Sequence, residues 1–452
     1  MADDSRPPRA SVLRSVGPGT RARRLVAQTA GNAGLNGATL AFNFVIALLL
    51  SRLLGADGYG AFAYAMAWAL LLTVPASLGL VPVVVREVAT YRVRKDWART
   101  RGLLRRSNQA ALGVALAVSV TAGVIFVALG WPEDPFFDPT IVALATVPLL
   151  VLVLLRQAAM QGFGVVVLAR VPERIVAPAL MIGFVLALQA ALAGGLSASW
   201  AVGAQVLAGA FAALIGVYLL RRTLPDEVRK TEPLYETRAW VAGGLPILAA
   251  SAIQAANLQA GTILTGSIAG PEEAGVYNVA VRIASLLPFL LLAATPSLMP
   301  LIAELDEKGS SEALQRVLTR AARLVFLGSL PLAIGAIVFA EPLLELFGEE
   351  FGAGAAALRI LCLGQLVNVA TGFAWTILVM VGEAGHGTWA VAAGTTLNLA
   401  LSAALIPTLG SDGAAIGAAV SMATTNVLMA ILLWRRCRIH SSVIRSRRAA
   451  VS

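Results

Sequence analysis

Charged residues are scarce in this sequence. Asp, Glu, Lys and Arg make up 13% of the 452 residues, whereas soluble domains carry about 25%. Cysteine is almost absent as well: Cys362 lies in an apolar run and Cys437 in a basic tail. The low charge excludes an ordinary soluble domain, and two isolated cysteines provide neither a disulfide framework nor a thiolate metal site.

The residue patterns of common catalytic sites are also missing. The only histidines are His386, in a short turn, and His440, in the tail, so there is no zinc-binding pair and no nucleophile with a neighbouring base. The Gly-x-x-x-x-Gly-Lys-[Ser/Thr] loop that holds nucleotide phosphates does not occur. The segments between apolar runs are too short for the extramembrane domain of a glycosyltransferase or ligase. We therefore expect a protein that is not an enzyme and that needs no metal or cofactor.

Apolar residues dominate what remains. They account for 58% of the chain, and the mean hydropathy is +0.78. Twelve runs are long enough to cross a hydrocarbon layer of about 30 Å, and only helices satisfy their backbone in lipid over such runs. The predicted spans are 32–53, 60–85, 107–130, 140–160, 174–194, 197–220, 240–268, 275–302, 321–340, 354–381, 386–407 and 413–434.

The basic residues orient these spans. The chain carries ten more basic than acidic residues, but they are confined to alternate inter-span segments instead of forming a surface for nucleic acid. If residues 1–31 are inside, the inner segments hold all basic residues except three, the outer turns hold none, and three of the outer turns, "WPEDPFFDP" (131–139), "GPEEAG" (270–275) and "EPLLELFGEEF" (341–351), are acidic. The positive-inside rule then places both termini in the cytoplasm. The first 31 residues lack the apolar core and cleavage site of a signal peptide, so we expect them to be retained.

A turn motif occurs twice. Residues 51–62 read "SRLLGADGYGAF" and residues 266–277 read "GSIAGPEEAGVY", so that at an offset of 215 Gly55 aligns with Gly270 and Gly60 with Gly275. An even number of spans in each half gives two parallel repeats around a central cavity. The predicted organisation is a basic N-terminal segment (1–31), a six-helix bundle (32–220), a cytoplasmic linker (221–239), a second six-helix bundle (240–434) and a basic tail (435–452).

Three arginines do not fit the inner segments: Arg52, Arg282 and Arg359. Each lies in the outer half or at the outer end of a predicted span, where a lipid-facing charge is costly. Such residues usually face a water-filled cavity or a partner. Arg52 has a simpler alternative, because it could pair with Asp57 in its own turn.

Four stretches resemble one family. "SRLLGADGYGAFAYAMAW" (51–68) followed by "ASLGLVPVVVREVATYR" (76–92) is similar to the opening of bacterial polysaccharide transporters, the oligosaccharide flippases. The C-terminal "LNLALSAALIPTLGSDGAAIGAAVSMATTNVLMAILL" (397–433) resembles their last two helices, and "GVVVLARVPERIVAPAL" (164–180) is also similar. The family belongs to the superfamily of multidrug, oligosaccharidyl-lipid and polysaccharide (MOP) exporters. The resemblance implies an all-α polytopic fold of the multidrug-and-toxin-extrusion (MATE) type in the bacterial inner membrane. It also implies a flippase for polyprenyl-diphosphate-linked oligosaccharide, the repeat unit of O-antigen, capsule or exopolysaccharide.

Binding of that cargo requires positively charged side chains for its diphosphate and polar side chains for its sugars. Arginine suits the first task because its planar fork binds phosphate oxygens in pairs and stays charged. The diphosphate candidates are Arg282, Arg359, Arg52, Arg156 and Arg174, of which the last two also satisfy the positive-inside rule. The sugar-contact candidates are Asn43, Asn257, Gln365 and Asn368, for which hydrogen bonds between helices are the alternative explanation. Expected partners are the lipid-linked oligosaccharide, the bilayer and the polysaccharide polymerase and ligase machinery, and no nucleic acid.

Two other functions fit the same pattern. A cation-coupled multidrug or metabolite antiporter would use this fold but would need a carboxylate near mid-membrane. The acidic residues Glu87, Glu173, Glu304 and Glu383 instead fall at inner helix ends. A lipid scramblase or an assembly scaffold is the third possibility, and substrate-dependent transport would exclude it.

Overall fold

The computed structural model describes residues 18–128, 136–192, 195–307 and 311–437, and within these ranges it contains helices and no strands. Parts of three predicted segments lie outside the described residues: 1–17 of the N-terminal segment, 131–135 of the acidic turn and 438–452 of the tail. The N-half helices are α1 (Pro18–Ala76), α2 (Leu80–Arg94), α3 (Trp97–Ala128), α4 (Phe137–Leu144), α5 (Thr146–Gly162), α6 (Val166–Val171), a π-helical turn (Pro172–Val176), α7 (Ala177–Ala191) and α8 (Ala198–Thr223).

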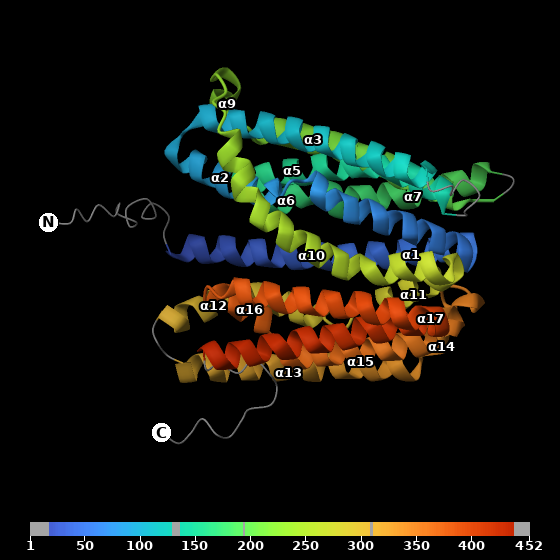
Figure 1. Cartoon of the computed structure of the whole chain (residues 1–452). Coiled ribbons are helices and arrows are strands. Elements are labelled where there is room, and N and C mark those ends of the chain that lie inside the picture. The colour runs from blue at the N-terminus through green and yellow to red at the C-terminus, as the bar shows by residue number, and fades with distance from the viewer. Residues whose placement is uncertain (1–17, 129–135, 193–194, 308–310, 438–452) are drawn as a thin grey trace.

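A short helix, α9 (Asp226–Lys230), lies in the predicted linker and precedes the C-half. The C-half helices are α10 (Thr237–Ala269), α11 (Pro271–Ala284), α12 (Phe289–Glu307), α13 (Ser311–Val338), α14 (Ala340–Glu345), a 3₁₀ turn (Glu349–Gly354), α15 (Ala355–Thr371), α16 (Ala374–Met380) and α17 (Ala384–Cys437). Figure 1 shows the two groups one above the other, with α10 between them.

Glycines divide the two longest helices. The backbone of α1 leaves the helical conformation at Gly55 (φ 68°), and that of α17 leaves it at Gly410 (φ 54°). A residue with a β-carbon is strained at such φ values. In Figure 1 the chain reverses direction at the right-hand end of α1, so α1 is two antiparallel helices joined by a tight turn.

The helices account for the predicted number of spans. Nine helical stretches in the described part of the chain are long and apolar enough to cross a membrane, and a tenth is the bent pair formed by α11 and α12. Since two of the nine contain the breaks at Gly55 and Gly410, they supply two further segments, which makes twelve. The prediction of an all-α polytopic protein is confirmed.

Several predicted span limits need correction. Span 60–85 is interrupted between the end of α1 at Ala76 and the start of α2 at Leu80, and span 354–381 is interrupted between α15 and α16, where Gly372 has a positive φ. Span 275–302 is not one helix, because α11 and α12 meet at an angle of 50° around Ser285–Pro288. Span 321–340 begins earlier, because α13 is continuous from Ser311 and includes arginines that the prediction placed in an inner loop. Helix propensity continues through basic residues, so charge alone does not mark where a helix begins.

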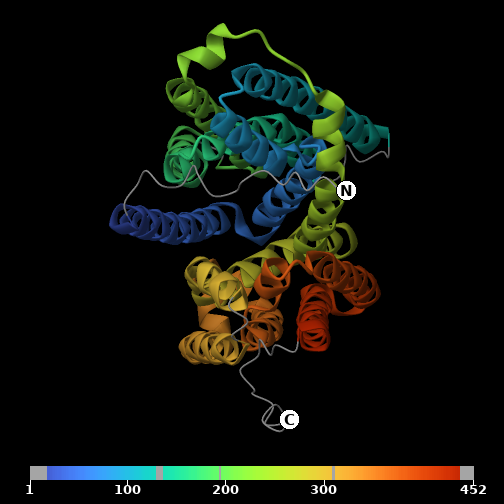
Figure 2. The same ribbon diagram turned by 90° about the vertical axis from the view of Figure 1, so that its left-hand side faces the viewer.

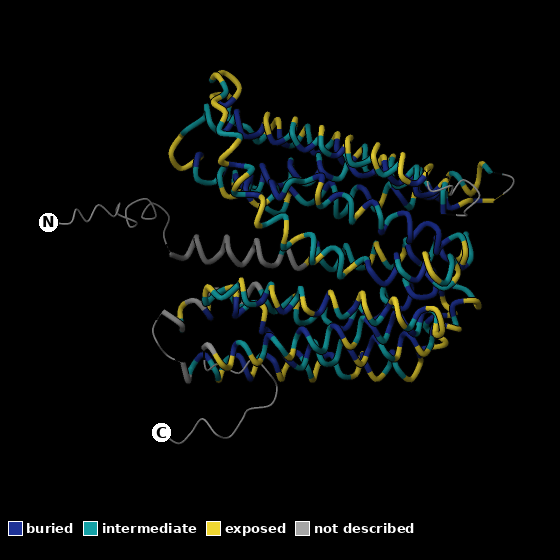
Figure 3. The backbone as a smooth tube through the Cα atoms, in the orientation of Figure 1, coloured by how far each residue is buried: buried dark blue, intermediate teal, exposed yellow. Residues whose placement is uncertain are grey.

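The described chain begins at Pro18 and ends at Cys437 on the same side of the molecule, the left in Figure 1. We call this the terminal side and the opposite one the distal side. Figure 2, which looks from the terminal side, shows the N-half and C-half helices as two separate groups. In Figure 3 exposed positions follow the outward edges of α3 and α13. On α3 these include Leu116, Val120 and Val124, each at least 50% exposed, as expected of a lipid-facing stripe.

Candidate functional site at the contact between the halves

The repeated turns pack against each other on the distal side. A β-carbon added to Gly60 would lie 1.7 Å from the carbonyl oxygen of Pro271. One added to Gly275 would lie 2.4 Å from the carbonyl oxygen of Ala56. The second glycine of each turn therefore lets the backbones of α1 and α11 touch, while the first, Gly55 or Gly270, has the positive φ that the turn requires. The sequence repeat thus marks the closest approach of the two halves.

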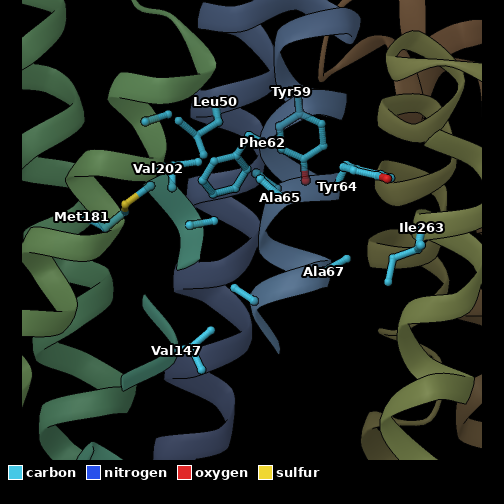
Figure 4. Close-up of a cluster of buried hydrophobic side chains, with 14 of the residues drawn as sticks. Leu50, Tyr59, Phe62, Tyr64, Ala65, Ala67, Val147, Met181, Val202 and Ile263 are labelled. Atoms are coloured by element: carbon cyan, nitrogen blue, oxygen red, sulfur yellow. The ribbon is translucent and has the colours of Figure 1, made fainter. Parts of the chain in front are cut away.

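A buried apolar cluster supports this contact from the N-half. In Figure 4 Leu50 and Phe62 of α1 lie beside Met181 of α7 and Val202 of α8. Tyr64 lies on the side of the second α1 segment toward α10, and the Tyr59 ring lies beside Phe62, with 6.3 Å between the ring centroids. Tyr64 shares a hydrogen bond of 3.0 Å with the Ser267 hydroxyl. One face of this segment is thereby fixed in the N-half core, and the other carries polar groups toward the C-half.

Tyr59 begins a chain of hydrogen bonds that crosses between the halves. Its hydroxyl donates to Oδ1 of Asn278 at 3.0 Å and accepts from Nε of Arg282 at 3.0 Å. Nε of Arg282 also lies 3.2 Å from Oδ1 of Asn278, whose Nδ2 donates to the Thr262 hydroxyl at 3.2 Å. Tyr59 itself is fully buried. These bonds fix the orientation of the Arg282 guanidinium through Nε.

The rest of the Arg282 guanidinium is not engaged. Its two terminal nitrogens, Nη1 and Nη2, make no hydrogen bond to any described residue, and no described carboxylate forms an ion pair with it. Two parallel N–H donors of this kind can bind one anionic group through two oxygens. The arrangement therefore suits an anion that enters from the side of Nη1 and Nη2.

Arg282 also lies at the end of a helix that is broken inside its span. It is in the last turn of α11, directly before the bend, and the Ser285 hydroxyl closes that turn by donating to the Arg282 carbonyl at 2.7 Å. With a rise of about 1.5 Å per residue, Arg282 is about 17 Å from the start of α11 at Pro271, a distance of about half the thickness of a hydrocarbon layer. Broken helices near mid-membrane are a common way to build transporter binding sites.

The distal rim is closed by two further bonds between the halves. Nε of Arg52 donates to the carbonyl oxygen of Leu346 at 2.7 Å, so Arg52 does not pair with Asp57 in its own turn. The turn is instead capped by Glu350, whose carboxylate accepts the Ala56 backbone N–H at 2.8 Å. Both partners come from the loop region before α15, almost three hundred residues away.

The remaining candidate arginines do not join Arg282. Arg359 is exposed on α15 and donates to the Ile337 carbonyl at 3.2 Å, within the C-half. Arg156 donates to the Ala213 carbonyl at 3.3 Å, between α5 and α8 of the N-half. Arg174 lies on the π-helical turn, and its Nε is buried without a hydrogen-bond partner among the described residues. Of the five predicted arginines, the structure places Arg282 and Arg52 at the contact between the halves.

The candidate amides fall into three groups. Asn257 accepts a hydrogen bond of 3.2 Å from Asn398, and this pair joins α10 to α17. Gln365 accepts from Asn368 at 3.1 Å on the same face of α15. Asn43 is exposed on the first segment of α1 and makes no hydrogen bond to a described residue.

Sequence reasoning missed Tyr59, Asn278 and Glu350. One signal for Asn278 was present, because it precedes Arg282 by four residues and therefore shares its helix face. Tyr59 follows the acidic residue of the repeated turn but has no polar equivalent in the second copy, where Ala274 takes its place. Glu350 could not be paired with Ala56 by any local pattern.

Family models match this chain over much of its length. A model described as "Polysaccharide biosynthesis protein" matches residues 25–306. The chain belongs to this family. A second model, MatE, matches residues 246–404, so the family resemblance predicted from the turn motifs is confirmed and the chain is a member of the MOP superfamily.

Two curated relatives come from Haloferax volcanii. The "Probable flippase AglR" is 25% identical over 170 residues, which cover 37% of this chain and 36% of the relative. The "Probable low-salt glycan biosynthesis flippase Agl15" is 27% identical over 163 residues, which cover 35% and 34%. The matches thus span about a third of the length of these relatives, which are named as flippases and not as enzymes.

Solved structures of MOP transporters share the fold over nearly the whole chain. A multidrug resistance MATE family transporter in an inward-facing conformation has a TM-score of 0.73 at 17% identity and covers 89% of this chain and 94% of its own. The outward-facing conformation of such a transporter has a TM-score of 0.63 at 16% identity, with coverage of 93% and 96%. A MOP transporter from Pyrococcus furiosus, whose structure is described by a "reverse polarity of binding pocket", has a TM-score of 0.63 at 16% identity and coverage of 92% and 95%. The MATE-like fold is confirmed.

Proposed function

We propose that this protein is a flippase that moves polyprenyl-diphosphate-linked oligosaccharide from the cytoplasmic to the outer leaflet of the bacterial inner membrane. Its termini and the linker 221–239 lie in the cytoplasm, so the terminal side faces inward and the distal side outward. The sugar and diphosphate enter between the halves 32–220 and 240–434, while the lipid tail remains in the bilayer. Family membership and the flippase names of the relatives support this proposal.

The observation that carries the proposal is the Arg282 guanidinium. It lies at the contact between the halves, with Nε held by Tyr59 and Asn278 and with both terminal nitrogens unbonded to any described residue. A diphosphate carries about two negative charges, and the arginine fork binds its oxygens in pairs. A cation carrier would need a carboxylate at this position. Among the described residues, no carboxylate forms a hydrogen bond or ion pair with Arg282.

Transport proceeds by opening the distal contact. In the present conformation Arg52, Ala56 and Tyr59 bind groups of the C-half on the distal side. All must release their partners before cargo can leave outward. The higher TM-score to an inward-facing than to an outward-facing transporter supports an inward-facing assignment.

Cargo binding competes with this closure. A diphosphate bound to Nη1 and Nη2 of Arg282 draws the guanidinium toward itself and weakens its bond to Tyr59. The cargo therefore binds more tightly when the distal contact is open than when it is closed, and this difference in affinity shifts the protein toward the open state. Asn43 and the Gln365–Asn368 pair remain our candidates for sugar contacts, and Arg359, Arg156 and Arg174 for secondary diphosphate contacts.

The test is transbilayer flipping of a fluorescent polyprenyl-diphosphate oligosaccharide in proteoliposomes. Hydrogen bonds to charged groups contribute about 1.5–3 kcal/mol, so Arg282→Ala should slow flipping by about 10- to 100-fold. Arg282→Lys should restore little, because lysine lacks the planar fork. The matched control is Arg222→Gln, which removes an exposed arginine that stacks on Tyr218 at the terminal side.

The competing function is a cation-coupled antiporter, favoured by the match of residues 246–404 to the MatE model. Export of an organic cation by the wild-type protein, without flipping of any of several diphosphate lipids, would replace our proposal with this one. Flipping by Arg282→Ala at the rate of Arg222→Gln would instead refute the role of Arg282 while leaving the flippase assignment standing.

A further inference from the structure

The N-half contains a second basic site, away from the contact between the halves. A cavity of about 250 Å³ lies between the start of α3, the end of α8 and the short helix α9. Three guanidinium groups line it, those of Arg101, Arg105 and Arg229. Apolar side chains form most of the rest of the wall, chiefly Leu220, Leu224 and Val228, and Asn108 is a further polar lining residue. No carboxylate is among the lining residues.

The positive charge of this groove is not neutralised within the described part of the chain. Arg101, Arg105 and Arg229 form no ion pair with a described carboxylate, although Asp226 and Glu227 belong to the same short helix as Arg229. Nη1 of Arg101 donates to the Thr231 carbonyl at 2.6 Å. Arg229 donates to the Arg221 carbonyl. Arg105 is exposed and has no hydrogen-bond partner among the described residues, so the groove offers charge-assisted donors to an anion.

The groove lies at the edge of the apolar region. Helix α8 ends with Arg221 and Arg222 in its last turn, and the Arg222 guanidinium lies 4.9 Å from the centre of the Tyr218 ring. Tyr218 is 53% exposed. An exposed tyrosine beside arginines at a helix end is typical of the level of lipid headgroups. The lining residues Leu220 and Leu224 are at this level.

We propose that the groove binds the phosphate of an anionic phospholipid, with Arg101, Arg105 and Arg229 around the phosphate and the first acyl carbons against Leu220 and Leu224. Basic pockets between helices on the inner side of membrane proteins bind lipid headgroups by this chemistry. The apolar wall distinguishes such a site from one for a soluble phosphate, which gains nothing from leucine side chains.

The proposal has a structural consequence for the segment that joins the halves. Arg101 and Arg229 also hold residues 221–231 through backbone carbonyls. A lipid phosphate between them therefore ties α9 to α3 and α8 and anchors this segment at the membrane surface. Nothing in this inference depends on the transported cargo.

The test uses the full chain, purified in neutral detergent and mixed with phosphatidylglycerol or phosphatidylcholine, with bound lipid counted by native mass spectrometry. We expect phosphatidylglycerol to be retained at least tenfold more than phosphatidylcholine. Arg105→Gln should weaken its binding about tenfold, since one charge-assisted donor is lost, and Arg105→Lys should weaken it less. Arg106→Gln is the matched control, because the neighbouring Arg106 faces Thr237 and Tyr235 instead of the groove.

Three results would overturn the proposal. Equal retention of both lipids would remove the preference for an anionic headgroup. Unchanged retention by Arg105→Gln and by Arg229→Gln would place the lipid elsewhere. Displacement of phosphatidylglycerol by millimolar inorganic phosphate would make the groove a site for free anions. The unfolding temperature of each variant is measured as a control. A value equal to that of the wild type shows that the variant is folded and that its loss of lipid binding is not caused by misfolding.

Discussion

The glycine contact between the repeated turns gives a quantitative test of how the distal side is closed. In Gly60→Ala the new β-carbon would lie 1.7 Å from the Pro271 carbonyl oxygen, whereas real β-carbons keep at least 3.0 Å. The backbones of α1 and α11 must therefore move apart by at least 1.3 Å, the difference between these distances. Because the obstacle is backbone, no side-chain rotation relieves it.

That movement also disrupts the neighbouring bonds between the halves. Ala56 and Tyr59 precede Gly60 on α1 and bond Glu350 (2.8 Å) and Asn278 (3.0 Å), and movement of α1 by this amount carries both bonds beyond hydrogen-bonding distance. Overpacking costs about 1–3 kcal/mol, and two lost hydrogen bonds cost about 1 kcal/mol each. The closed distal contact should lose about 3–5 kcal/mol, which is a factor of at least a hundred in its population.

The assay is a distance measurement between spin labels at Asp57 and Glu349, which are exposed on the distal side of the N-half and C-half. They are attached to cysteines in a background without Cys362 and Cys437. We expect a single short distance in the parent protein and a longer one in Gly60→Ala. Gly275→Ala should act in the same way, and the double variant should add little, because both substitutions act on one contact.

The matched control is Gly37→Ala, on the first segment of α1, where no other part of the structure lies within 4 Å of the added β-carbon. It should leave the distance unchanged. If Gly60→Ala keeps both the parent distance and the parent unfolding temperature, the packing of the two turns does not hold the distal side closed.

Three further predictions concern single side chains. Tyr59→Phe removes the hydroxyl that bonds Asn278 and Arg282, so the same spin labels should report a larger open fraction, and an unchanged distribution would show that the network is dispensable. Asn398→Ala removes a 98%-buried amide that joins α10 to α17 and should lower the stability in detergent by about 1 kcal/mol; Asn368→Ala, on a single helix, should cost less. Burial raises the pKa of the Asp96 carboxyl, but hydrogen bonds from the side chain and backbone of Arg99 outweigh it and lower the pKa below its ordinary value of 3.8. The stabilisation by Asp96 is therefore present above pH 3.8 and is lost as the pH falls through the lower folded value, so Asp96→Asn should flatten the acid side of the unfolding-temperature profile; a profile identical to that of the parent would contradict this.

The contacts of α10 suggest how the two halves remain linked while the distal side opens. At its terminal end α10 approaches the N-half, where Nε1 of Trp240 donates to the Tyr91 hydroxyl at 3.1 Å. Further along, its Asn257 is bonded to Asn398 of the C-half. A helix that is fixed to both halves can bend or tilt between them, and Pro246, inside α10, removes one backbone donor from its first turns.

The sequence alone determined the features that depend on local composition. Hydropathy over about twenty residues is enough to count membrane-crossing runs, since each must satisfy its own backbone in lipid. The repeat of Gly55 and Gly60 at Gly270 and Gly275 revealed two related halves, and the motifs around these turns indicated the family. The distribution of basic residues predicts that both termini lie in the cytoplasm. The contacts within the protein do not test this orientation, which stays a proposal.

Only the tertiary structure decided which residues meet. From the sequence alone, Arg52, Arg282 and Arg359 cannot be told apart, because each is a basic residue in or at the end of an apolar run. In the fold, Arg52 binds Leu346 across 294 positions, Arg282 is held by Tyr59 across 223 positions, and Arg359 bonds within its own half. Such pairings follow from how rigid helices pack, and a difference of one residue in helix rotation, about 100°, would send each side chain to a different neighbour. No periodicity in the chain carries that information.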